Sequence, residues 1–151
     1  MSRKFVRSWA VVTTMIVFSG CGKKAIDVED AVIKTRKKLS PVSGVVLVDG
    51  KPLPDVLVHF YSMDGTEVAT LGQTDENGAF KMSTYHPGDG SPQGEYRVTF
   101  EKLRFRKSTG AWVGPDQLKN LYSDPRKSEF KLQIPAQPVK DLKYELKVAG
   151  R

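Results

Sequence analysis

The segment Glu95–Leu103 alternates between apolar and polar residues, and this period of two restricts what the chain can fold into. Its apolar positions are Tyr96, Val98 and Phe100, which fall on one side of an extended backbone. A helix would need apolar residues three and four apart, so the spacing predicts a strand with one buried face. The chain from residue 41 onward repeats this pattern.

Seven short segments share this character and are separated by turn sequences. We expect strands over 42–48, 56–61, 66–74, 79–84, 95–103, 130–134 and 142–148. Asp49-Gly50 and Asn77-Gly78 are strong turn pairs. Residues 104–127 look irregular, with one helical turn expected at 115–122 behind Pro115. The sequence therefore predicts an all-β fold, an antiparallel seven-strand Ig-like β-sandwich over 41–151.

Residues 1–20 have the three parts of a secretory signal peptide. Arg3, Lys4 and Arg7 give a basic start, WAVVTTMIVF at 9–18 is apolar, and Ser19-Gly20 supplies small residues before a cut. As a helix, ten residues would cover roughly 15 Å, about half of a hydrocarbon core. We therefore expect a signal peptide rather than a permanent transmembrane helix.

Cys21 is the single cysteine of the chain, so no intramolecular disulfide can form. The stretch Phe18-Ser19-Gly20-Cys21 resembles the lipobox of bacterial lipoproteins. That resemblance implies cleavage before Cys21, lipidation of its thiol and acylation of the new amine. The acyl chains would make attachment to a membrane effectively permanent. The alternative is an ordinary signal peptide that leaves Cys21 as a free thiol.

Residues 21–40 are expected to form the lipidated N-terminus and a tether. Residues 22–40 carry six basic residues and three acidic ones, and the tether is either a weak amphipathic helix or a solvated spacer. The whole chain has a net charge of +7, but residues 41–151 hold 15 basic and 14 acidic residues. The basic excess lies in the signal and tether, so it is no argument for nucleic acid as a partner.

Several motifs after residue 40 resemble a carboxypeptidase regulatory-like (transthyretin-like, prealbumin-like) domain. They are VSGVV at 42–46, DGKPL at 49–53, VLVHF at 56–60, TDENGAF at 74–80 and PGDG with PQGEYRV at 87–98. YSDP at 122–125 is similar to small exported lipoproteins built on this module. The resemblance implies a prealbumin-like seven-strand sandwich. It implies no particular activity, because such folds host unrelated functions.

The sequence offers little catalytic chemistry, and we expect neither an enzyme nor a cofactor. Two histidines, His59 and His86, are too few for most zinc sites. An iron site with His59, Tyr61, Tyr85 and His86 as ligands is a formal alternative to ordinary surface and half-buried side chains. Transthyretin-like hydroxyisourate hydrolases end in Tyr-Arg-Gly-Ser, whereas this chain ends in Val-Ala-Gly-Arg.

Two turn sequences resemble ligand loops. Residues 75–78 (DENG) have a carbonyl-rich composition but lack the spaced carboxylates of an EF-hand, so we expect a hairpin turn. Residues 87–90 (PGDG) have no following lysine or helix that would make a phosphate cradle, so a turn is expected there too.

A binding surface is the stronger hypothesis for the loop 102–113. Basic and aromatic residues are mixed there, and the candidate ligand-binding residues are Arg104, Phe105, Arg106 and Trp112. Such mixtures can hold acidic glycans, peptides or phosphate. The alternative is a solvated strand end.

We therefore expect a membrane-anchored lipoprotein with a non-enzymatic sandwich module. Its partner would be an envelope protein or a glycan, and the alternative function is a carbohydrate or small-ligand module using residues 102–113. Gly22 follows the cysteine where an Asp often causes inner-membrane retention, which favours the outer membrane, facing the periplasm.

Overall fold

The computed structural model describes residues 36–148, and the compact unit within it begins at Lys37, four residues before the expected domain start. Its strands are β1 (Leu39–Ser40), β2 (Val42–Val48), β3 (Lys51–Pro52), β4 (Leu57–Ser62), β5 (Val68–Gln73), β6 (Ala79–Ser83), β7 (Ser91–Pro92), β8 (Gly94–Glu101), β9 (Arg104–Arg106), β10 (Ala111–Val113), β11 (Lys131–Ile134) and β12 (Val139–Leu146). The described part of the chain contains no helix, so none there is long and apolar enough to cross a membrane.

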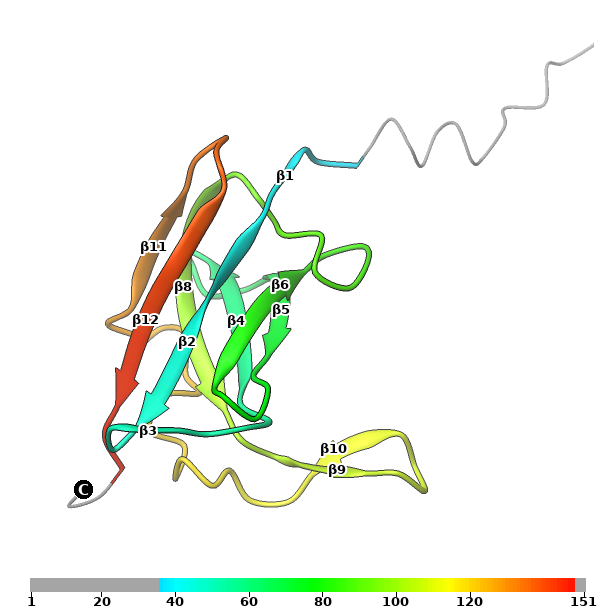
Figure 1. The fold of residues 1–151 in the computed structure, drawn as a ribbon, viewed down its shortest axis with the longest axis vertical. Coiled ribbons are helices and arrows are strands. Elements are labelled where there is room, and N and C mark those ends of the chain that lie inside the picture. Colours follow the sequence, from blue (N-terminus) through cyan, green and yellow to red (C-terminus); the bar gives the residue numbers. More distant parts are fainter. Residues whose placement is uncertain (1–35, 149–151) are drawn as a thin grey trace, which may run out of the picture. The chain divides into compact units, whose positions relative to one another are not determined.

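Eight strands form one continuous sheet in the order β11-β8-β4-β5-β6-β2-β12, with β3 paired to β2. The sheet folds over between β5 and β6, where the register is Leu71↔Ser83 and Gly72↔Met82. This places β11, β8, β4 and β5 in one layer and β6, β2 and β12 in the other (Figure 1). The prediction of an all-β sandwich is confirmed.

One strand pair departs from the expected antiparallel arrangement. β12 lies parallel to β2, with Tyr144 opposite Val46, whereas the other strand pairs among residues 36–148 are antiparallel. The reason is the short segment 135–138, which carries the chain from β11 in one layer to β12 in the other. β12 therefore pairs with β2 rather than with β11, the strand that precedes it.

The core lies between the two layers and uses the apolar positions that alternation predicted. Val58 and Phe60 of β4, and Val98 and Phe100 of β8, have no exposed surface. The ring of Phe100 packs against Tyr144 of the opposite layer, with centroids 5.0 Å apart. Burial of such side chains contributes about 1.5–3 kcal/mol each. The period-two pattern therefore determines which face of each strand is inside.

Residues 104–127 differ from the expected irregular segment. β9 and β10 form an antiparallel hairpin, with Arg104 opposite Val113 and Arg106 opposite Ala111. The helical turn predicted at 115–122 is wrong: Lys119 and Asn120 have φ values of 59° and 57°, which a right-handed helix excludes. The Asp116 carboxylate accepts the backbone N–H groups of Leu118 and Asn120 within this segment.

Candidate functional site

The β9–β10 hairpin brings two of the predicted site residues directly together. Phe105 and Trp112 are opposite each other in its register, and their ring centroids are 5.1 Å apart at an interplanar angle of 58°. Phe105 is 47% exposed although it is a large apolar side chain. The pair is therefore an aromatic surface presented outside the core.

This aromatic pair forms one wall of a groove of about 560 Å³. The hairpin side of the groove consists of Lys102, Leu103, Arg104, Phe105 and Trp112. The sandwich side consists of Asp55, Gln73 and Gln117. The structure thus brings together three of the four predicted site residues and leaves Arg106 outside the lining.

The residues from the sandwich side were not predicted as part of a site. Asp55 follows the proline-rich turn after β3, and Gln73 is the last residue of β5. The Gln73 amide Nε2 donates a hydrogen bond of 2.8 Å to the Asp55 carboxylate. The Lys102 ammonium donates a hydrogen bond to the backbone carbonyl of Pro54. These contacts fix part of the groove wall before any ligand arrives.

Asp116 holds the base of the hairpin. Its carboxylate accepts the backbone N–H of Lys102 at 2.8 Å and those of Leu118 and Asn120 at 3.0 Å. In return the N–H of Gln117 donates to the carbonyl of Lys102 at 3.0 Å. Leu118 is 1% exposed and anchors the loop in the core. The point where β8 leads into the hairpin is therefore fixed by a buried carboxylate.

The side chains of Arg104 and Arg106 give the hairpin a positive charge that no acidic side chain of the hairpin neutralises. Within residues 36–148, the ion pair closer than 4 Å is Lys127–Asp124, far along the chain from the groove. The guanidinium groups of Arg104 and Arg106 have no hydrogen-bond or ion-pair partner among these residues. An anion at the groove would meet a guanidinium that is free to bind it.

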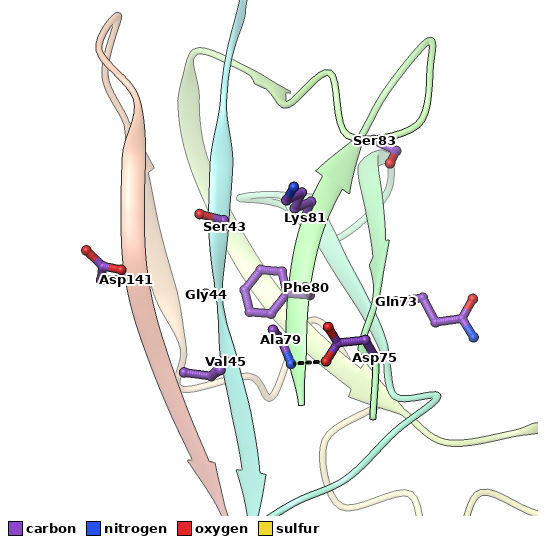
Figure 2. Close-up of a pocket in the computed structure, with 10 residues that line it drawn as sticks. All are labelled: Ser43, Gly44, Val45, Gln73, Asp75, Ala79, Phe80, Lys81, Ser83 and Asp141. Carbon is purple, nitrogen blue, oxygen red and sulfur yellow. Dashed lines mark hydrogen bonds between the residues drawn. The ribbon is translucent and has the colours of Figure 1, made fainter. Parts of the chain in front are cut away.

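A second hollow, of about 570 Å³, lies over the outer face of β2 and β6 (Figure 2). Ser43, Lys81 and Asp141 contribute polar groups to its lining. Asp75 also reaches it, but its carboxylate already accepts the N–H groups of Asn77 and Ala79 at 2.9 Å. This hollow has no exposed aromatic side chain, since its one ring, Phe80, is 2% exposed and points into the core.

The two turn sequences have the structures expected of them. Asp75 and Gly78 close a tight turn between β5 and β6, with Gly78 at φ 71°. In the second loop the Asp89 carboxylate accepts the N–H groups of Thr84, Tyr85 and His86 at 2.7 to 2.9 Å. Partial burial acts to raise the pKa of Asp89, but these bonds and His86 lower it overall. Its role is to hold the loop.

The four residues of the alternative iron site are divided between β4, which carries His59 and Tyr61, and the loop after β6, which carries Tyr85 and His86. His59 and Tyr61 are neighbours on the outer face of β4, with centroids 6.2 Å apart, and burial lowers the pKa of His59. Tyr85 lies in the loop after β6, where its hydroxyl accepts the N–H of Lys37. Among residues 36–148, no group of three or more His, Cys, Asp or Glu is placed to hold a metal ion.

Cys21, the predicted lipidation site, lies outside the described residues. Comparisons with known proteins add little about the domain itself. No protein-family model matches the chain, and no curated protein matches it. Among solved structures, the crystal structure of a 9R-lipoxygenase from Cyanothece PCC8801 is similar at 18% sequence identity and a TM-score of 0.38. The alignment covers 80% of this chain and 20% of the lipoxygenase chain.

Proposed function

We propose that the chain is a lipoprotein, attached to a membrane through Cys21, whose sandwich serves as a non-enzymatic interaction module of the cell envelope. The observation that carries the proposal is the order of the N-terminal sequence. A basic start, the apolar run 9–18 and small residues lead directly to Cys21. The compact domain then begins at Lys37.

The length of the segment between Cys21 and the domain limits how far an anchored domain could lie from the membrane. Residues 22–36 separate Cys21 from the compact unit. Fully extended, fifteen residues span at most about 50 Å. The domain would therefore stay close to the membrane surface. Gly22 in place of Asp favours the outer membrane, facing the periplasm.

Detergent-phase partitioning tests the anchor. Wild-type protein expressed in a bacterium should sediment with the membranes and enter the Triton X-114 phase. Cys21→Ser protein, with its signal peptide replaced by one that is cleaved independently of residue 21, should lose both properties, because the thiol that receives the lipid is gone. Equal partitioning of the two proteins into detergent would overturn the proposal.

A second candidate function, ligand binding, is favoured by the groove beside the hairpin. Arg104, Phe105 and Trp112 all line it, together with the polar residues Asp55, Gln73 and Gln117. Ligand sites commonly combine an apolar surface with a few placed polar groups. A glycan array probed with wild-type and Trp112→Ala protein tests this function. Glycan signals that are equal in both proteins would exclude the groove.

A further inference from the structure

The groove lies at the end of the sandwich away from the point where the tether joins. β1, which follows the tether, lies at one end of the long axis, and the β9–β10 hairpin projects at the other (Figure 1). β2 runs between these two ends. Within the described domain, the groove and β1 therefore lie at opposite ends.

We infer that this groove binds an acidic polysaccharide, a chain of pyranose units that carry carboxylates; the inference rests on the proposed ligand-binding function. The Phe105–Trp112 pair, in which Phe105 is 47% exposed and Trp112 is half-buried, provides the apolar part of such a site. Pyranose rings have faces of C–H groups that pack against aromatic rings. Trp and Phe can provide this surface at little cost in conformational entropy because each has few rotatable bonds.

The other polar side chains that line the groove match sugar hydroxyls. Gln73 and Gln117 carry amides, which both donate and accept, and Asp55 carries a carboxylate, which accepts. A sugar hydroxyl is itself both a donor and an acceptor, so it can form a hydrogen bond with any of these three side chains. A phosphate offers mainly acceptors, so it could use the amide N–H groups but would provide few donors to the Asp55 carboxylate. This combination therefore favours a glycan over a simple phosphate anion.

The charge of the groove selects an acidic glycan. Lys102 and Arg104 line it against the single carboxylate of Asp55, which is already hydrogen-bonded to Gln73. The Arg104 guanidinium has no partner among the described residues, and its planar fork can bind a sugar carboxylate through two parallel hydrogen bonds. A neutral glycan would leave this group unused.

Calorimetric titration of the full mature chain in detergent micelles tests the inference with a matched pair of probes. One is a cello-oligosaccharide, and the other is its uronate form, in which the primary hydroxyls are oxidised to carboxylates. The uronate should bind at least about tenfold more tightly, the effect of one charge-assisted hydrogen bond. This comparison uses wild-type protein and depends on no variant folding.

Two arginines of the same hairpin provide the matched control. Arg104→Ala should weaken uronate binding about tenfold, whereas Arg106→Ala, which removes the same charge outside the groove, should change it less than about twofold. Arg104→Lys should restore part of the affinity. Equal losses at Arg104 and Arg106 would show general charge attraction and overturn the site.

The remaining outcomes separate the two proposals. If both oligomers bind equally and Trp112→Ala removes this binding while Arg104→Ala does not, the acidic preference is wrong and the groove still binds ligand. If neither oligomer binds at millimolar concentration, the acidic-glycan inference is overturned. The glycan array then decides separately whether the groove binds any other glycan.

Discussion

Phe105 and Trp112 lie opposite each other on β9 and β10 with their ring centroids 5.1 Å apart, and no other strand of the described chain pairs with this hairpin. An isolated two-stranded hairpin is marginally stable in water. The aromatic pair, worth about 0.5–1.5 kcal/mol beyond its buried area, is therefore a main support of the hairpin.

Trp112→Ala should loosen the hairpin without unfolding the sandwich. Hydrogen–deuterium exchange should become faster in peptides covering residues 104–113, while peptides covering β8 keep their protection. Trp112→Phe, which retains a ring, should restore much of the protection. Unchanged exchange in the hairpin of the alanine variant would contradict the role given to this pair.

Asp116→Ala should destabilise the domain by roughly 3 kcal/mol, because three backbone N–H groups lose a charged acceptor at a site that is 8% exposed. Urea unfolding measures the change. Asp124→Ala is the matched control: its carboxylate accepts the N–H of Arg126 at the surface, and its loss should cost less than about 1 kcal/mol. An equal loss of unfolding free energy in the two variants would contradict the structural role given to the Asp116 carboxylate.

Gly90→Ala should cost more than about 3 kcal/mol. Gly90 has a φ of 106°, and a Cβ there would lie 2.2 Å from the carbonyl oxygen of Ser40. The substitution would push β1 away from β7. Gly110→Ala, at φ 63° with nothing within 4 Å, should cost only about 1 kcal/mol. Thermal unfolding of the two variants gives the comparison, and similar midpoints would contradict the close contact at Gly90.

The pH dependence of stability should report the burial of His59. Burial lowers its pKa below the ordinary 6.5, so the unfolded chain binds the proton more readily than the folded one. The free energy of unfolding should therefore fall as pH drops from about 6.5 towards the folded pKa. His59→Gln should reduce this fall, whereas His86→Gln, at an exposed loop position, should leave it in place. If His59→Gln leaves the fall in unfolding free energy unchanged, His59 is not the group responsible for it.

The sandwich could be predicted from the sequence because burial on one face of a strand leaves a period of two. That period places Tyr96, Val98 and Phe100 on one face of their strand, and all three are buried. The direction of β12 could not be predicted in this way. Its alternation is the same whether β2 runs parallel or antiparallel to it, and only the crossing at 135–138 decides the direction.

Only part of the candidate site could be predicted from the sequence. Arg104, Phe105 and Trp112 are close in the chain, so their mixture of charge and aromatic character could be noticed. Asp55 and Gln73 come from distant segments, and only the pairing of β4 with β5 and β8 brings them to the same place. Asp116 follows Gly114-Pro115, a local turn signal, but Pro115 equally suits the first turn of the helix predicted there.

Intact mass spectrometry of protein extracted from bacterial membranes tests the lipid anchor at Cys21. We expect a mature chain that begins at Cys21 and carries the added mass of a diacylglyceryl group and an N-linked acyl chain. A mature chain that begins at another residue, or at an unmodified Cys21, would contradict it.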